Sequence, residues 1–444
     1  MSTQSILEAV LTEPSLPEVH SSVRLSRSPV YWRRLLGFLG PGFLISVGYM
    51  DPGNWATDIA GGSQFGYTLL FVIMLSNLMA ILLQSLSLKL GVATERDLAQ
   101  LCRERYGPRT SFALWVMAEI AIAACDLAEV VGSAIALLLL FHIPLFFGVL
   151  ITGLDVLLIL VLQRWGFRYI EALVIALIGA IIALFGVQMF LSRPDYWPAL
   201  HDLFVPQMSI LHDPLMLYIA IGILGATVMP HNLYLHSSIV QSRRYQRTPE
   251  GKREAIHMAN IASALALTIA LFVNAAILIV AAAVFYRSGH FEVAAIQDAF
   301  KLLSPLLGAG AASTLFAIAL LASGQNSSIT GTLAGQVVME GFIHLRLSPW
   351  LRRLVTRSLA IIPTILVVAF MGEQGTEKLL ILSQVILSFQ LSFAVVPLVL
   401  FTGDRKRMGE FVNPRWLQAL AWTTAVVIAG LNVWLLVQTA LGHN

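Results

Sequence analysis

Long apolar runs separated by short polar connections set the pattern of this chain from about residue 36 onward. A run of roughly 18 to 25 apolar residues is what a helix needs to cross a bilayer. On this measure the sequence predicts an all-α integral membrane protein with eleven transmembrane helices. The predicted ranges are 36–62, 67–88, 111–140, 146–162, 169–191, 214–240, 257–285, 312–343, 354–371, 377–401 and 416–440.

Two of these helices, the first and the sixth, carry residues that disfavour a continuous helix in lipid. The first contains Asp51-Pro52-Gly53-Asn54, and the sixth contains Met229-Pro230-His231-Asn232. Proline removes a backbone donor and glycine lowers helix propensity, so we expect both helices to unwind there. Aligned on their prolines, the two segments share a Pro-x-Asn core.

Each broken helix begins a block of five spans, which indicates an inverted 5+5 repeat. Five spans reverse the direction of insertion, so the two blocks run antiparallel and their breaks meet near the bilayer midplane, where transporters of this kind bind substrate. The chain then divides into a disordered cytoplasmic tail (1–35), a first repeat (36–191), a second repeat (214–401) and an additional eleventh helix (416–440).

The distribution of charge gives the orientation. Of 28 Lys and Arg residues, only Arg193, Arg287, Lys301 and Lys378 lie outside one alternate set of connections. Positive loops stay in the cytoplasm, which places the amino terminus inside and the carboxyl terminus outside the cell membrane. Because 57% of the residues are apolar and only 12% are charged, the composition excludes an ordinary soluble protein, and the basic residues give no sign of nucleic-acid binding.

The breaks carry groups that bind cations. A carboxylate at membrane depth is costly without a cationic partner, so Asp51 is a functional candidate. Asn54 offers an amide oxygen, Ala226 a backbone carbonyl and Met229 a thioether sulfur, and sulfur favours transition metals over Mg²⁺ and Ca²⁺. Two simpler interpretations stay open: Met229 can be a packing residue, and Asn54 can cap the helix that follows the break.

A polar stripe on the third helix suggests a route for protons. Glu119, Asp126 and Glu129 fall within one quadrant of that helix, facing the bundle interior. His231, two residues after Met229, has a side chain that titrates near physiological pH. Arg352 and Arg353 can pair with the stripe or act only as positive-inside anchors. His236 is expected to be a structural or gating residue rather than a ligand.

These motifs, together with Gly324-Gln325-Asn326-Ser327-Ser328-Ile329-Thr330-Gly331-Thr332 in the eighth helix, resemble the Nramp (natural resistance-associated macrophage protein) family over residues 36–440. The family more often has Ser where this chain has Asn326. The resemblance implies a fold of the leucine-transporter type, with Asp51, Asn54, Met229 and the carbonyl of Ala226 as metal ligands. It also implies a ligand from a glutamine of the tenth helix, for which Gln384 is the match and Gln390 the rival.

By the same resemblance, Asp51, Asp126, Glu129, His231, Arg352 and Arg353 carry protons. Gln84 then lies behind the metal site, although a hydrogen bond between helices explains a membrane glutamine equally well.

The predicted function is proton-coupled import of divalent transition metals, such as Mn²⁺ or Fe²⁺ and also Cd²⁺ or Co²⁺, across the inner membrane by a monomer with no permanently bound cofactor. The alternative is a sodium-coupled transporter of an organic solute with the same architecture. An intramembrane enzyme is disfavoured because the HExxH and GxSxG motifs are absent from the sequence. Cys102 and Cys125 give no disulfide or CxxC site.

Overall fold

The computed structural model describes residues 14–17, 19–26, 28–153, 167–293, 295–308, 310–343 and 349–440, and these are almost entirely helical. The exceptions are two short strands, β1 (Val23–Arg24) and β2 (Arg243–Arg244), which pair in parallel. Within the described residues, seven helical segments are long and apolar enough to cross a membrane. The predicted all-α class is confirmed, whereas the total of eleven spans stays a prediction.

Most predicted spans agree with observed helices to within eight residues at either end. The long helices are α2 (Tyr31–Gly48), α3 (Pro52–Phe65), α4 (Leu70–Thr94), α6 (Pro108–Phe141), α9 (Phe167–Ser192), α12 (Pro214–Thr227), α13 (Pro230–Ile239), α14 (Pro249–Val284), α16 (Ala312–Ile343), α17 (Pro349–Thr402) and α19 (Arg415–Ala440). The shorter connecting elements are α5 (Leu98–Arg105), α7 (Leu145–Thr152), α10 (Tyr196–Phe204), α11 (Ser209–His212), α15 (Ile296–Leu307), α18 (Arg405–Met408), η1 (Val240–Ser242), η2 (Tyr286–Ser288) and η3 (Gly409–Phe411).

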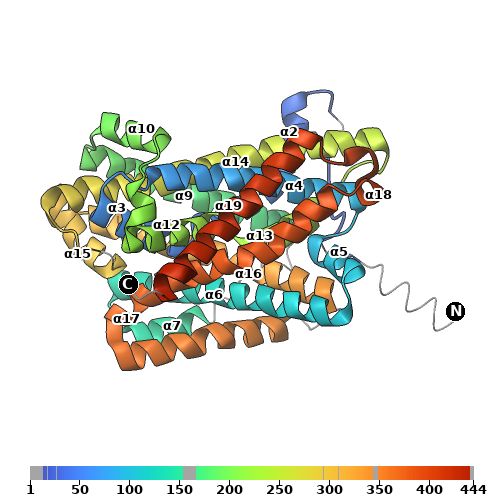
Figure 1. Ribbon diagram of the computed structural model, residues 1–444. Coiled ribbons are helices and arrows are strands. Elements are labelled where there is room, and N and C mark those ends of the chain that lie inside the picture. The colour runs from blue at the N-terminus through green and yellow to red at the C-terminus, as the bar shows by residue number, and fades with distance from the viewer. Residues whose placement is uncertain are drawn as a thin grey trace.

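Three predicted spans need comment. The range 146–162 falls on α7 and on residues 154–166, which lie outside the described part of the chain. The predicted range 377–401 agrees with the candidate membrane span Gly375–Thr402. The range 354–371 falls on the first part of α17, which is helical throughout its 54 residues and so has no break between the two ranges. At 1.5 Å per residue a straight helix of this length would measure about 80 Å, far more than a bilayer is thick. Figure 1 shows instead that the α17 ribbon turns back on itself.

Both predicted breaks are present, and tight packing holds the first one in place. The first helix is interrupted between α2 and α3, and the sixth between α12 and α13. Trp55 of α3 is fully buried between Phe185 of α9 and Phe316 of α16, with ring centroids 4.9 and 5.1 Å apart. Gly132 of α6 lies directly against the ring of Pro52, where a larger residue would collide. The broken segment is therefore clamped on several sides.

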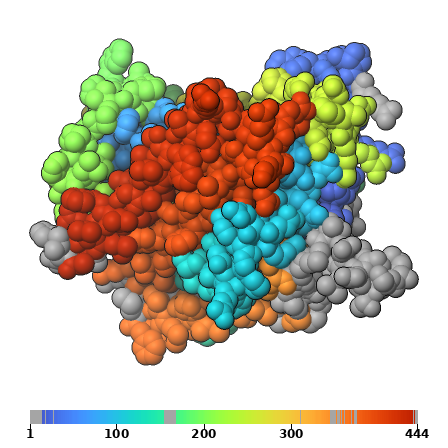
Figure 2. All heavy atoms as spheres, turned by 45° about the vertical axis from the view of Figure 1, so that its right-hand side comes forward, coloured from blue at the N-terminus to red at the C-terminus, as the bar shows by residue number. Residues whose placement is uncertain are grey.

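The last helix, α19, lies on the outside of the bundle. Figures 1 and 2 both show it running obliquely across the surface beside the ribbon and side chains of α17. Asn432 of α19 donates to the carbonyl of Ser388 of α17 at 2.9 Å and accepts from the hydroxyl of Ser388 at 3.0 Å, and Gln418 of α19 donates to the carbonyl of Val399 at 3.0 Å. This position fits the prediction that the eleventh helix is an addition to the repeat.

The prediction of a disordered tail over residues 1–35 is wrong for the described residues from 14 onward. Leu16 is only 2% exposed, and its backbone amide donates to Glu340 Oε2 of α16 at 3.0 Å. The backbone amide of Ser21 donates to the carbonyl of Gln241, at 2.9 Å, next to the β1–β2 pair. This segment therefore packs across the end of the bundle, with Leu16, Val19 and Val23 all buried.

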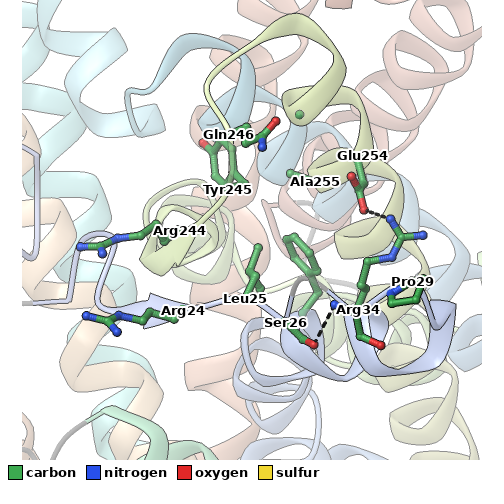
Figure 3. A pocket seen from close by; sticks show the side chains of 13 residues that line it. Arg24, Leu25, Ser26, Pro29, Arg34, Arg244, Tyr245, Gln246, Glu254 and Ala255 are labelled. Carbon is green, nitrogen blue, oxygen red and sulfur yellow. Dashed lines mark hydrogen bonds and ion pairs between the residues drawn. The ribbon is translucent and has the colours of Figure 1, made fainter.

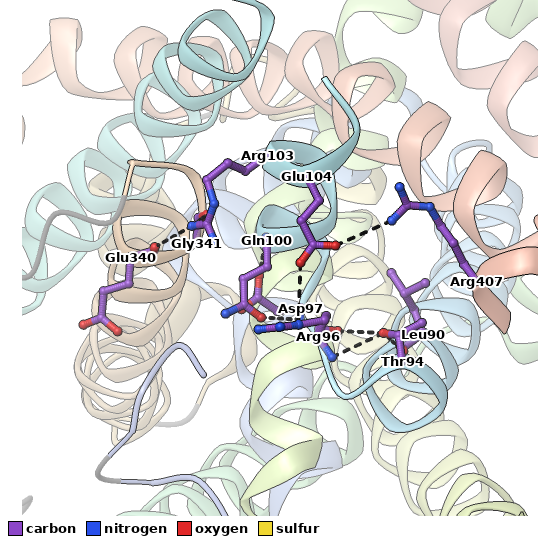
Figure 4. A network of polar contacts seen from close by, with 10 residues as sticks. All are labelled: Leu90, Thr94, Arg96, Asp97, Gln100, Arg103, Glu104, Glu340, Gly341 and Arg407. Atoms are coloured by element: carbon purple, nitrogen blue, oxygen red, sulfur yellow. Dashed lines mark hydrogen bonds and ion pairs between the residues drawn. The ribbon is translucent and has the colours of Figure 1, made fainter. Parts of the chain in front are cut away.

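Polar contacts also fix α5 at this end of the molecule (Figure 4). Asp97 caps the helix by accepting from the amide of Gln100 at 2.8 Å, and the Gln100 side chain accepts from the amide of Asp97 at 3.1 Å. Arg103 donates to the carbonyls of Glu340 and Gly341 at the end of α16. These contacts tie α5 to the helix that also holds the tail.

Candidate metal-binding site

Asp51 shapes the first break. It is the N-cap of α3, and its Oδ1 accepts a hydrogen bond from the amide of Asn54 at 2.8 Å. The expectation that Asn54 could be the cap is therefore wrong: the cap is Asp51, and Asn54 lies three residues into the helix. Oδ2 of Asp51 and Oδ1 of Asn54 are buried and have no hydrogen-bond partner in the described part of the chain. Both oxygens are thus available to a cation.

The backbone carbonyls of this break are already occupied. The carbonyl of Tyr49 accepts from the side-chain amide of Asn274 of α14, at 2.8 Å. The carbonyl of Met50 accepts from the indole of Trp55, at 3.3 Å, and from the hydroxyl of Ser323 of α16. These bonds replace those lost when the helix unwinds. They leave side-chain oxygens, rather than carbonyls, as the unsatisfied acceptors of the first break.

The second break brings a sulfur atom to the first. α12 ends at Thr227, so its last carbonyls, including that of Ala226, have no partner further along the helix. Met229 is the N-cap of α13, and its Sδ lies 3.7 Å from Nδ2 of Asn232. A Cβ atom placed on Gly48, the last residue of α2, would lie 3.1 Å from the same sulfur. The two breaks therefore face each other.

Gln384 of α17 packs against the first break. Its side-chain amide packs directly against Gly53 of α3, and a Cβ atom on Gly53 would collide with this amide. Nε2 of Gln384 donates to Ser383 Oγ at 2.9 Å, whereas Oε1 has no partner in the described residues. Gln390, the rival, lies beside the hydroxyl of Tyr234, on α13 beyond the break. Of the two glutamines, the structure thus brings Gln384 to the first break.

All five predicted ligand positions are at most 1% exposed: Asp51, Asn54, Ala226, Met229 and Gln384. Three of them carry side-chain oxygens without a partner among the described residues. Leaving a buried acceptor unpaired costs about 1–3 kcal/mol, and more for a charged group. One dehydrated cation would satisfy all three oxygens, and its ligands would be a carboxylate, two amides, a carbonyl and a thioether.

A chain of polar side chains leads from the second break to α6. Nε2 of His231 lies 3.7 Å from Sγ of Cys125, and that sulfur lies 3.6 Å from Oε1 of Glu129. A Cβ atom on Gly331 of α16 would lie 3.1 Å from Oε1 of Glu129 and 3.2 Å from Oδ1 of Asp126. Both carboxylates therefore converge on one glycine, within reach of the break.

The predicted stripe on α6 divides into two parts. Asp126 and Glu129 are buried together, whereas Glu119 is half-buried and accepts from the indole of Trp115 at 3.0 Å. The side chains of Arg352 and Arg353, predicted as partners of the stripe, lie outside the described part of the structure.

Gln84 and His236 lie behind the breaks. Gln84 of α4 donates to the hydroxyl of Tyr49, at 2.8 Å, and its Oε1 lies 2.9 Å from Nδ1 of His236. The hydrogen bonds run from the first break to α13 through α4. They match the interhelical hydrogen bond that the sequence left open for Gln84, and they agree with a structural place for His236.

Comparison with known proteins settles the family. The family model described as "Natural resistance-associated macrophage protein-like" (Nramp) matches residues 42–438. The chain belongs to the Nramp family. Two curated relatives, each named "Divalent metal cation transporter MntH", are 64% identical to it (Nostoc sp., 97% of each chain) and 61% identical (Mesorhizobium japonicum, 97% of this chain and 95% of the relative).

Solved structures give the fold. A crystal structure of the Eremococcus coleocola manganese transporter matches this Nramp chain with a TM-score of 0.87 and 44% identity, over 94% of this chain and 90% of that one. Mhp1 and MhsT match with TM-scores of 0.63 and 0.62 at 14% identity, over 96% and 89% of this chain and 94% and 97% of theirs, and so share the fold alone. The predicted membrane fold of the leucine-transporter type, with two broken helices, is confirmed.

Sequence reasoning missed three residues that support this Nramp site. Cys125 was given no role, yet it bridges His231 and Glu129. Asn274 and Ser323 hold the carbonyls of the first break. A buried amide or cysteine inside an apolar helix was the available signal, but pairing it with a partner more than 100 residues away requires the fold.

Proposed function

We propose that this protein imports divalent transition-metal ions, Mn²⁺ or Fe²⁺ with Cd²⁺ and Co²⁺ as further substrates, together with protons. The observation that carries the proposal is the convergence of Asp51, Asn54, Met229 and Gln384 at two facing helix breaks inside the bundle. The relatives that cover almost the whole chain are named as divalent metal cation transporters, and the matched crystal structure is of a manganese transporter.

The donor set explains the class of ion. Hard cations such as Mg²⁺ and Ca²⁺ favour all-oxygen cages, while the thioether of Met229 is tolerated by softer ions. Asp51 supplies the only formal charge among the five ligands, so the bound divalent ion keeps a net positive charge. A single carboxylate with neutral donors suits a carrier, which must release its ion, better than a permanent metal centre.

Burial of the site supports alternating access. Because the five ligand positions are at most 1% exposed, an ion reaches them only when helices move. The interrupted helices supply the moving parts, since α2 and α13 can tilt about the breaks without unwinding the rest of the bundle. The charge distribution supports a cytoplasmic amino terminus and an extracytoplasmic carboxyl terminus in the plasma membrane, and a complete site within one chain supports a functional monomer.

The acidic residues of α6 supply the proton route. Protons pass between Asp51 and His231 at the breaks and then to Glu129 and Asp126, with Arg352 and Arg353 at the far end. Cys125 lies within 3.7 Å of both His231 and Glu129, so it orients these two side chains toward one another. Of these groups only Asp51 is also a metal ligand, so a proton that leaves it when the ion binds has acceptors of its own in His231, Glu129 and Asp126.

Sodium-coupled transport of an organic solute is not supported. The relatives that match the full chain are metal transporters, whereas the organic-solute transporters match at 14% identity and share only the fold. The packed contacts between the breaks also suit a single ion rather than a larger solute.

Uptake into proteoliposomes tests the proposal. Mn²⁺ entry should acidify a lumen loaded with a pH-sensitive dye and should proceed without sodium. Met229→Ala should keep Mn²⁺ uptake but admit Ca²⁺ more readily, whereas Met216→Ala, a buried methionine of α12 away from the break, should leave selectivity unchanged. Uptake that requires sodium and leaves the lumen pH constant would refute the proposal.

A further inference from the structure

The amino-terminal segment pairs as a short strand with the residues that directly follow the sixth helix. β1 and β2 pair in parallel, with Val23 opposite Arg243 and Arg24 opposite Arg244. Successive side chains of a strand point to opposite faces, and paired residues of neighbouring strands point to the same face. Val23 and Arg243 are accordingly buried, at 3% and 2% exposure, and Arg24 and Arg244 are both exposed. Figure 3 shows these two arginines projecting side by side.

Among the described residues, no carboxylate neutralises this pair of cations. Two arginines close to this pair do have a carboxylate partner: Arg34 with Glu254 at 2.6 Å, and Arg243 with Glu171 at 2.7 Å. Arg24 and Arg244 form no ion pair with any described residue. Two guanidinium groups fixed side by side repel each other unless an anion lies between them, which makes the pair a candidate anion site.

The pair borders a cavity with an amphipathic lining. The cavity has a volume of about 670 Å³. Arg24 and Arg244 line it together with apolar residues, among them Leu25, Phe38 and Ala255, and with the ion pair of Arg34 and Glu254. A small hydrated anion has no need of the apolar part of this lining. A phosphate that carries an acyl-glycerol group would use both parts.

The neighbouring surface carries side chains typical of a bilayer interface. Trp32 and Leu36, on the first turns of α2, are 69% and 64% exposed. Exposed tryptophan beside exposed leucine marks the depth at which headgroups meet acyl chains. On the orientation proposed above, this is the cytoplasmic leaflet, where anionic phospholipids attract basic segments.

We propose that Arg24 and Arg244 bind the phosphate of an anionic phospholipid, whose glycerol and acyl portion lies along Leu25 and Phe38. Planar guanidinium groups match phosphate oxygens in bidentate geometry, so two of them in strand register clamp one phosphate. The bound lipid holds β1 against β2 and thereby ties the amino-terminal segment to the end of the broken sixth helix. The site is independent of the metal ligands.

Native mass spectrometry of the full-length protein tests this. Purified protein is incubated with phosphatidylglycerol or with phosphatidylcholine, and the retained lipid is counted. The wild type should retain more phosphatidylglycerol than phosphatidylcholine, and R24Q/R244Q should retain at least tenfold less phosphatidylglycerol than the wild type. The matched control is Arg33→Gln, which should retain lipid as the wild type does: Arg33 is exposed and precedes the cavity-lining Arg34 in sequence, but it does not line the cavity itself.

Further variants and a competition experiment distinguish the possible explanations. R24K/R244K keeps the charge but loses bidentate geometry, so intermediate retention supports the phosphate clamp and also shows that the fold survives substitution. Equal loss in R33Q and R24Q/R244Q would overturn the proposal in favour of general surface charge. Displacement of the lipid by millimolar inorganic phosphate would overturn the lipid assignment and leave a phosphate site. Mn²⁺ uptake, measured separately, reports on the proposed transport function alone.

Discussion

Replacing Glu171 by Gln should destabilise the protein strongly, because Glu171 neutralises a buried arginine. Arg243 is 1% exposed at its side chain and lies 2.7 Å from Glu171, which is 9% exposed. Nε of Arg243 also donates to the carbonyl of Gly37 of α2, at 2.7 Å. The pair therefore joins α9 to the ends of both broken helices. Only glycine fits at position 40 of α2, since a Cβ atom there would collide with the side chains of both Glu171 and Arg243.

The magnitude follows from burial. Removing one partner of a buried ion pair costs about 3–5 kcal/mol, because the remaining charge is left uncompensated. Glutamine keeps one acceptor oxygen, so we expect a loss near 3 kcal/mol, or roughly a hundredfold in the folding equilibrium. Glu254→Gln is the matched control: its pair with Arg34 is just as short, at 2.6 Å, but is 35% and 47% exposed. A pair of that kind contributes about 0–1 kcal/mol.

The assay is denaturant unfolding of each purified variant in the same detergent. E171Q should unfold at clearly lower denaturant concentration than E254Q. The double variant E171L/R243M, which removes both charges, should recover most of the loss, since a buried pair can be replaced by apolar residues at little cost. Equal destabilisation in E171Q and E254Q, or no recovery in the double variant, would refute the reasoning.

The remaining predictions concern pH, the glutamine ligand and the proton route. Burial raises the pKa of Asp97 from 3.8 to about 6, although the hydrogen bond from the amide of Gln100 acts in the opposite direction. The carboxyl group therefore loses its proton at lower pH in the unfolded chain than in the folded one, and the free energy of unfolding of the wild type should fall by up to about 3 kcal/mol between pH 4 and pH 6. Asp97→Asn should flatten this fall when unfolding is measured against pH, and an unchanged slope would contradict the prediction. Gln384→Leu should weaken Mn²⁺ binding in calorimetry at least tenfold while Gln390→Leu leaves it within twofold, and the reverse order would exchange their roles. Cys125→Ala should slow lumen acidification relative to Mn²⁺ entry, and a fixed ratio of the two would remove Cys125 from the proton route.

The breaks could be predicted because their signals are local. Proline and glycine disfavour helix wherever they occur in lipid, so Asp51-Pro52-Gly53 and Met229-Pro230 marked the interruptions directly. Asp51 stood out because an ionised group at membrane depth needs a partner. Helix lengths followed from bilayer thickness, and α16 has the bounds that the apolar pattern predicts. These inferences depend on one residue or one segment at a time.

What the sequence could not supply are contacts between distant segments. The tail looked disordered because nothing in its composition shows that Leu16 fits beneath Glu340, more than 300 residues away. Asn54 looked like a cap because either Asp51 or Asn54 can play that part, and only the backbone geometry at Asp51 decides between them. The continuous helix across the predicted ranges 354–371 and 377–401 was not foreseen, because a polar stretch can turn between two spans and still remain helical.

The central claim is that the breaks hold one divalent cation, with Asp51 as its charged ligand. Calorimetric titration of Mn²⁺ into Asp51→Asn tests it most directly, with Asp213→Asn as the control. Asp213 is also the N-cap of a helix that begins with proline, accepting from the amide of Leu215 at 2.9 Å, but it lies at the start of α12 rather than at its break. We predict that D51N shows no Mn²⁺ binding while D213N binds as the wild type does. Micromolar affinity retained in D51N would contradict the account.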